Sequence, residues 1–122
     1  MTKRPTILVL DDDAEMLRLL STVLSESYEV FTANDAMQAL DLLKIIRYDL
    51  FITDLSMPLL SGADFIRMIR YQAKYDRMPI LVISGYAQMA AELKGVPVTA
   101  TLHKPVALGE LFSCIEGILN GG

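Results

Sequence analysis

The sequence contains no tryptophan, one histidine and one cysteine. With Cys114 alone, no disulfide can form within the chain, and a zinc site built from cysteine and histidine is close to excluded. An unpaired cysteine agrees with a reducing compartment, and we expect a cytoplasmic location.

Long apolar runs and clusters of basic residues are also missing. The first apolar stretch, Thr6–Leu10, spans five residues and meets three aspartates, which excludes a signal-peptide core or a membrane span there. The formal net charge is −4, and no run of lysine or arginine occurs. We therefore expect this domain to bind neither nucleic acid nor a membrane directly.

What the chain does have is enough apolar residues for a core. Its 122 residues, 52% of them hydrophobic, predict a single domain over residues 1–122. Five short apolar runs, typical of strands, alternate with longer stretches of helical periodicity. The runs are Ile7–Leu10, Tyr28–Ala33, Leu50–Thr53, Ile80–Ile83 and Val98–Leu102.

The stretches between the runs predict amphipathic helices. Apolar residues share one helix face in four of them, while Tyr86–Lys94 gives a weaker helical signal. The marker residues are Leu17, Leu20 and Leu24; Leu40, Leu43 and Ile46; Phe65, Ile66 and Ile69; and Leu108, Leu111, Phe112, Ile115, Ile118 and Leu119. Five βα units in sequence predict a doubly wound α/β fold: a five-stranded parallel sheet with five helices on both faces.

Polar residues follow the buried runs where each strand is expected to end. Asp11 and Asp12 follow the first run, Asp54 the third, Ser84 the fourth and Lys104 the fifth. Ligands of open α/β sheets bind at the carboxyl ends of the strands, where the strand order reverses. With the order 2-1-3-4-5, the three aspartates would converge, with the serine and the lysine beside them.

The charge of such a cluster indicates what it binds. Three carboxylates and one ammonium group leave a charge of −2, and like charges about 4 Å apart repel by about 4 kcal/mol at an effective dielectric of ~20. Protons or a divalent cation must relieve this repulsion, and the oxygen ligands suit Mg²⁺. A carboxylate beside the metal can attack phosphorus and form an aspartyl-phosphate.

In this order, these residues resemble the receiver domain of two-component response regulators. The resemblance covers nearly the whole chain and implies a flavodoxin-like fold. It rests on four segments: Ile7–Asp13; Asp49–Asp54 with Met57-Pro58 and Gly62; Leu81–Gly85; and His103-Lys104-Pro105.

The resemblance also implies a role for each site residue. Asp54 would accept a phosphoryl group from a histidine kinase or a phosphotransfer protein. Asp11, Asp12, Asp54 and the backbone carbonyl of Ser56 would bind Mg²⁺. Ser84 would move toward the phosphoryl group and Lys104 would pair with it, switching a partner surface. The Lys104-Pro105 bond is often cis in this family.

Two features depart from the family pattern. Many members carry an aromatic residue three positions before the lysine, where this chain has Thr101. No output domain is present, so both a stand-alone regulator and a piece of a longer protein stay open.

Some residues near these motifs have simpler explanations. Asp13 is expected to cap a helix, Cys114 to be a small core residue, and His103 to be structural or exposed. Tyr86 is a weak candidate for the border of the site.

Two other functions are considered beside the receiver. Asp11-x-Asp13 fits the spacing of haloacid-dehalogenase-like phosphatases, but no late acidic pair follows Ser84 and Asp54 would have no role. A receiver-like module that is never phosphorylated is the other alternative. We expect a phosphoryl-accepting signalling domain, not an enzyme with an external substrate.

Overall fold

The computed structural model describes residues 3–57 and 59–121. Five strands and five α-helices alternate along this part of the chain, with a short 3₁₀ helix, η1, before the fourth strand. They are β1 (Thr6–Leu10), α1 (Ala14–Leu24), β2 (Glu29–Ala33), α2 (Ala36–Ile45), β3 (Leu50–Thr53), α3 (Gly62–Arg70), η1 (Ala73–Tyr75), β4 (Ile80–Ser84), α4 (Tyr86–Glu92), β5 (Ala100–His103) and α5 (Leu108–Asn120).

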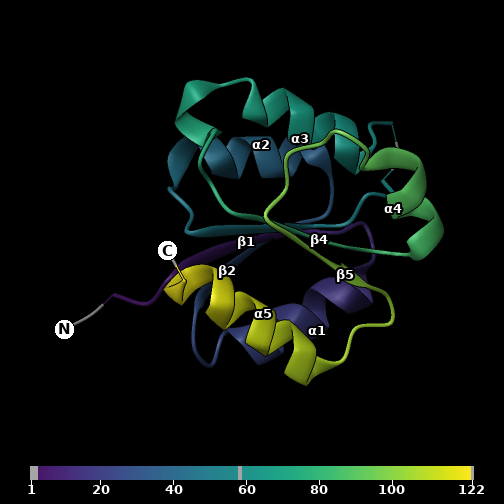
Figure 1. Cartoon of the computed structure of the whole chain (residues 1–122). Coiled ribbons are helices and arrows are strands. Elements are labelled where there is room, and N and C mark those ends of the chain that lie inside the picture. Colours follow the sequence, from purple (N-terminus) through teal and green to yellow (C-terminus); the bar gives the residue numbers. More distant parts are fainter. Residues whose placement is uncertain (1–2, 58, 122) are drawn as a thin grey trace.

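The strands form one parallel sheet in the order β2-β1-β3-β4-β5, as predicted. Helices α1 and α5 cover one face, and α2, α3 and α4 the other (Figure 1). Every residue of β1, β3 and β4 is buried, because both faces of these central strands are covered. Each face has its own apolar core, one centred on Phe51 and Phe65, the other on Leu20 and Ile115.

The helix starts follow from local sequence. Asp13 and Asp35 cap α1 and α2, and their side chains accept hydrogen bonds from exposed backbone N–H groups of the first turn. Ser61 caps α3 in the same way. None of the helices in the described residues has the length and apolar character needed to span a membrane.

Several predicted boundaries and faces are corrected. Tyr28 lies before β2, since its N–H donates to the carbonyl of Leu24 at the end of α1. Ile46 has extended backbone and lies beyond α2 rather than on its apolar face. Strand β5 starts two residues later than predicted and reaches His103, which pairs with Ser84 of β4. Leu108, counted on the apolar face of α5, is 40% exposed.

Candidate phosphoacceptor and metal site

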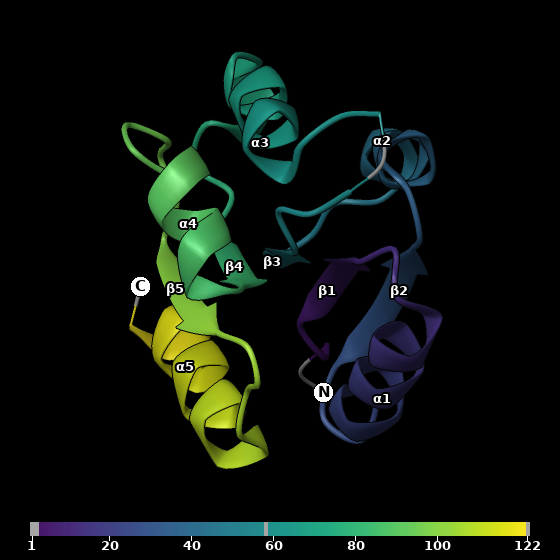
Figure 2. The same cartoon turned by 90° about the vertical axis from the view of Figure 1, so that its right-hand side faces the viewer.

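The acidic residues separated in sequence come together at the carboxyl edge of the sheet, which faces the viewer in Figure 2. Asp11 follows β1 and Asp54 follows the neighbouring strand β3. Carboxylate oxygens of Asp11, Asp12 and Asp54 all lie within 4.8 Å of one another. Asp11 and Asp54 are buried, whereas Asp12 is exposed. The predicted convergence of the three aspartates is confirmed.

The Asp54 carboxylate is held by hydrogen bonds to both of its oxygens. Oδ1 accepts from the backbone N–H of Leu55 at 2.7 Å and from that of Ser56 at 3.4 Å. Oδ2 accepts from Lys104 Nζ at 2.9 Å. The start of α3 packs closely behind this residue: a Cβ on Gly62 would lie 2.3 Å from the Asp54 carbonyl oxygen. Only a glycine fits there without a shift of the backbone.

Lys104 bridges the two buried acids. Its ammonium lies 2.9 Å from Asp54 Oδ2 and 3.3 Å from Asp11 Oδ2. Burial by itself would lower the pKa of Lys104, but the hydrogen bond to Asp54 and the charge of Asp11 outweigh it, so the pKa is raised. The Lys104-Pro105 bond is cis, as the resemblance implied.

Opposing interactions act on the Asp11 carboxylate. Burial raises its pKa, the hydrogen bond from the Asp13 N–H and the charge of Lys104 lower it, and the nearby charge of Asp54 raises it again. The result is a pKa above the ordinary value of 3.8. By formal charge, the three carboxylates and one lysine of this cluster leave −2.

The donor set fits a hard divalent cation. Oxygens bound to one Mg²⁺ at 2.0–2.1 Å lie about 3–4 Å apart, so small side-chain rotations would bring oxygens within 4.8 Å of each other onto one ion. The unbalanced negative charge is what such an ion would neutralise. Asp11, Asp12 and Asp54 are the residues that would hold it.

The structure separates Asp13 from this cluster. Its Oδ1 accepts from the N–H groups of Glu15 and Met16, at the start of α1. The predicted capping role of Asp13 is confirmed. The carboxylate that lies beside Asp11 is that of Asp12 or Asp54, and not that of Asp13 as in the phosphatase hypothesis.

The other predicted site residues lie nearby. Ser84 is buried at the end of β4, and its carbonyl accepts from the backbone N–H of Lys104 at 2.9 Å. Ser56 lies in the loop after Asp54, where its N–H contacts the carboxylate. Pro58, part of the motif behind Asp54, lies outside the described residues.

One contact beside the site was not predicted. Tyr86, at the start of α4, stacks on His103 at the end of β5, with ring centroids 3.4 Å apart and an interplanar angle of 15°. Thr101, where an aromatic was considered, is exposed in β5. In the sequence, Tyr86 comes two residues after the end of β4, and His103 is the last residue of the neighbouring strand β5. This spacing is the signal from which the contact could have been predicted.

Cys114 is half-buried and packs against the core on the α1 and α5 face. Its predicted role as a small core residue is therefore confirmed.

The chain is a doubly wound α/β domain. At the carboxyl edge of its sheet lies a cluster of three carboxylates whose oxygens could hold a metal ion. The family model for the response regulator receiver domain matches residues 7–116. The chain belongs to this family. It is therefore a receiver domain of the two-component type, a phosphoacceptor signalling module.

Similar proteins agree with this assignment. The chain is 30% identical to the cell cycle response regulator CtrA of Brucella ovis over 93% of this chain and 49% of that protein. It is also 30% identical to hybrid signal transduction histidine kinase D of Dictyostelium discoideum, over 95% of this chain and 8% of that protein. The chain thus spans at most about half the length of these relatives.

Solved structures show the same fold. The chemotaxis response regulator CheY4 of Vibrio cholerae is 29% identical, with a TM-score of 0.88 over 96% of this chain and 100% of that one. The receiver domain of a sensor histidine kinase from Pseudomonas aeruginosa, 24% identical, has a TM-score of 0.88 over 96% of this chain and 98% of that one.

Proposed function

We propose that Asp54 is the phosphoacceptor, that Asp11, Asp12, Asp54 and the backbone carbonyl of Ser56 bind Mg²⁺, and that Ser84 and Lys104 form the switch. The observation that carries the proposal is the position of Asp54, whose Oδ2 lies 2.9 Å from Lys104 Nζ within the acidic cluster. The Pseudomonas receiver domain is described with a magnesium ion coordinated in its active-site cleft, which supports the choice of metal.

The transfer step follows from this geometry. An Asp54 carboxylate oxygen attacks the phosphorus of a phosphohistidine, the new O–P bond forms, and the P–N bond to the donor imidazole breaks. The imidazole nitrogen keeps the electron pair. A bound Mg²⁺ supplies positive charge to the acidic cluster and to the phosphoryl oxygens.

The protein's own groups would position the product. The Leu55 and Ser56 N–H groups, which now bind Asp54 Oδ1, are placed to hold the carboxylate as it reacts. Lys104 would exchange its contact with Asp54 Oδ2 for one with a phosphoryl oxygen. Movement of the Ser84 hydroxyl toward the phosphoryl group would carry the signal to a partner surface through β4 and α4.

The donor partner would be a histidine kinase or a phosphotransfer protein, and the output would be a domain or partner of unknown identity. We place the protein in the cytoplasm and treat residues 1–122 as one receiver domain. The domain alone would contact neither nucleic acid nor a membrane, in keeping with its net charge of −4.

Intact-mass measurement after incubation with acetyl phosphate and MgCl₂ tests the proposal. We expect one added phosphoryl group in the wild type and none in Asp54→Asn or in the presence of EDTA. The matched control is Asp41→Asn, an exposed carboxylate of α2, which should be labelled normally. Labelling that persists in Asp54→Asn would refute the assignment, and a folded wild type that is never labelled would favour the unphosphorylated module.

A further inference from the structure

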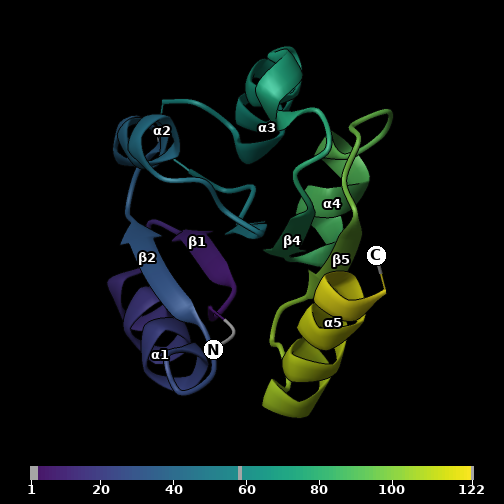
Figure 3. The same cartoon turned by 90° about the vertical axis from the view of Figure 1, so that its left-hand side faces the viewer.

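A hollow lies at the amino edge of the sheet, opposite the acidic cluster. Figure 3 shows this edge of the sheet facing the viewer. The hollow has a volume of about 710 Å³ and lies between the end of α2, the loop before β3, η1 and the end of α5. This volume falls within the range of about 300–1,000 Å³ typical of ligand pockets. The phosphorylation chemistry does not use it, since Asp11, Asp54 and Lys104 do not line it.

Positive charge gathers around this hollow in an otherwise acidic protein. Lys44, Arg47, Lys74 and Arg77 line it, and all four are exposed. They make up four of the eleven lysines and arginines of a chain whose net charge is −4. None of the four has a carboxylate within 4.0 Å in the described part of the chain.

The one acid in the lining does not neutralise these cations. Asp49 Oδ2 accepts a hydrogen bond from the backbone N–H of Thr6 at 2.8 Å, which ties this carboxylate to the start of β1. Counting formal charges, the lining carries +4 from the basic residues and −1 from Asp49, a net +3. An occupant should therefore be anionic.

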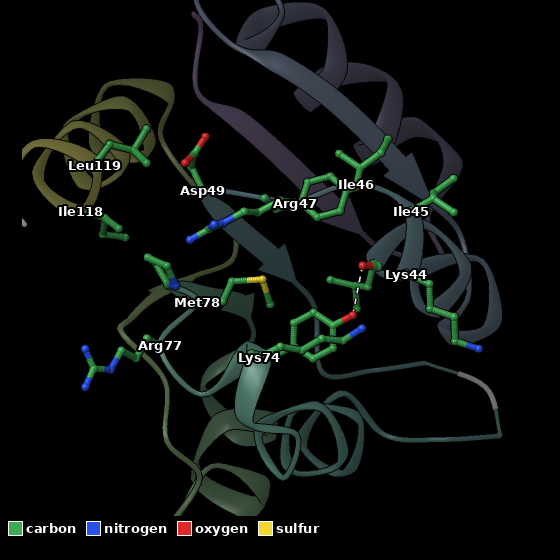
Figure 4. A pocket seen from close by; sticks show the side chains of 14 residues that line it. Lys44, Ile45, Ile46, Arg47, Asp49, Lys74, Arg77, Met78, Ile118 and Leu119 are labelled. Atoms are coloured by element: carbon green, nitrogen blue, oxygen red, sulfur yellow. Dashed lines mark hydrogen bonds between the residues drawn. The ribbon is translucent and has the colours of Figure 1, made fainter.

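The floor and rim of the hollow are apolar. Met78 is buried, Ile118 and Leu119 are half-buried, and Ile45 at the rim is 74% exposed. Figure 4 shows Met78 among the lining residues, with Arg47 lying above it in this view. A purely charged ion would leave these apolar groups without a contact, so the occupant should also carry an aliphatic or aromatic group.

The hollow does not end at its own lining residues. A second hollow of about 530 Å³ shares Arg77, Met78, Pro79 and Ile118 with the first and continues along the same edge toward α5. Arginine and methionine, the types of Arg47, Arg77 and Met78, are also enriched in protein interfaces. An extended polypeptide can fill both hollows, which a compact anion cannot.

We infer that the amino edge of this domain binds an acidic segment of a partner protein, one in which carboxylates flank one or two large apolar side chains. The carboxylates would pair with Arg47, Lys74 and Arg77, and the apolar side chain would pack on Met78 and Ile118. Asp54 lies at the other edge of the sheet and does not line the hollow, so the inference does not rest on the proposed phosphorylation.

The test is a titration of the ¹⁵N-labelled wild-type protein with the blocked peptide Asp-Asp-Leu-Phe-Glu-Asp, followed by NMR. We expect saturable shifts in the backbone signals of residues 44–49 and 74–78. Charge reversal in Arg47→Glu or Lys74→Glu should weaken binding by about tenfold. Arg18→Glu, an exposed residue of α1 that makes the same change in net charge, should leave the affinity unchanged.

Two further probes separate the stated partner from other anions. The peptide Asp-Asp-Ala-Ala-Glu-Asp has the same charge as the first peptide but lacks its large apolar side chains, and it should bind the wild type several-fold more weakly. The Ile45→Ser variant should likewise bind the first peptide several-fold more weakly than the wild type does. Equal binding of the alanine peptide would overturn the inference. The inference would also be overturned if a single-stranded DNA oligonucleotide bound more tightly than the first peptide, or if the NMR signals shifted outside residues 44–49 and 74–78. An equal loss of peptide affinity in Arg18→Glu would overturn it as well. Because the substituted side chains are exposed, we expect each variant to fold. A cooperative thermal unfolding transition of each variant checks this.

Discussion

Replacement of Asp12 by asparagine should stabilise the metal-free protein and remove its response to Mg²⁺. Asp12 is the exposed member of the acidic cluster, and its ligand oxygen lies within 4.8 Å of those of Asp11 and Asp54. Asparagine keeps the size and shape of the side chain but carries no charge. The substitution therefore removes repulsion while leaving the buried contacts of Lys104 in place.

The size of the effect follows from distance and exposure. Two carboxylates 4.8 Å apart repel by about 3.5 kcal/mol at an effective dielectric of ~20, and by about 1 kcal/mol in water. Because Asp12 is exposed, the value near water applies to each of its two pairs. The attraction of Asp12 to the Lys104 ammonium offsets one of these two repulsions. We therefore expect the free energy of unfolding of Asp12→Asn in EDTA to rise by about 1 kcal/mol, which corresponds to roughly 3–6 °C in Tm.

Thermal unfolding in EDTA and in excess MgCl₂ measures both effects. A free ion tenfold above its Kd would stabilise the wild type by about 1.4 kcal/mol, and Asp12→Asn should lose most of this gain. Asp13→Asn is the matched control, since Asp13 lies next in the chain but caps α1, a role asparagine also fills. It should keep its Mg²⁺ response.

Two results would refute this reasoning about Asp12. One is an unchanged or lower Tm of Asp12→Asn in EDTA. The other is a Mg²⁺-dependent increase in Tm equal to that of the wild type.

Three further changes test other parts of the structure. Gly62→Ala should lower the free energy of unfolding by about 1–3 kcal/mol, because the added Cβ would clash with the Asp54 carbonyl oxygen. Gly109→Ala is the control, since the space around Gly109 is open and the protein should not lose stability. Equal urea midpoints of the two variants would contradict this. Burial raises the pKa of Tyr48 to about 12, so above pH 10 the unfolded state ionises first and stability falls as pH rises through 10–12. Tyr48→Phe should reduce that alkaline loss by about 1–3 kcal/mol in pH-dependent unfolding, and an unchanged slope would count against the shift. Leu59 is fully exposed with φ of 70°, so Leu59→Gly should be neutral or stabilising by up to about 1 kcal/mol by calorimetry, and a clear loss of stability would show that this backbone is not strained.

The central strands could be predicted because their sequences leave little choice. Ile7–Leu10 and Ile80–Ile83 are apolar at every position, and such runs are stable only between two covered faces. The edge strand β5 was placed less well, since Val98 is apolar but packs against the core as part of a loop. Its neighbour Thr99 uses its hydroxyl oxygen to accept from the N–H of Ile80, a contact with no signal in local periodicity.

The convergence of the three aspartates could be predicted, but the detailed contacts around them could not. The position of Asp54 after a buried strand placed it beside Asp11 once the strand order was assumed. That Lys104 bridges both acids depends on the path of the chain after β5, which the residue pattern does not specify. The Tyr86–His103 stack likewise arises from the relative placement of α4 and β5.

The bridge made by Lys104 ties the site to the completion of folding. Its two partners lie 93 and 50 positions earlier in the chain. Asp11 and Asp54 precede Lys104 in the chain, so the sheet must include β5 before the lysine can lie between the two buried acids. The contact between the lysine and the two acids therefore forms only when the edge of the sheet farthest from β2 is in place.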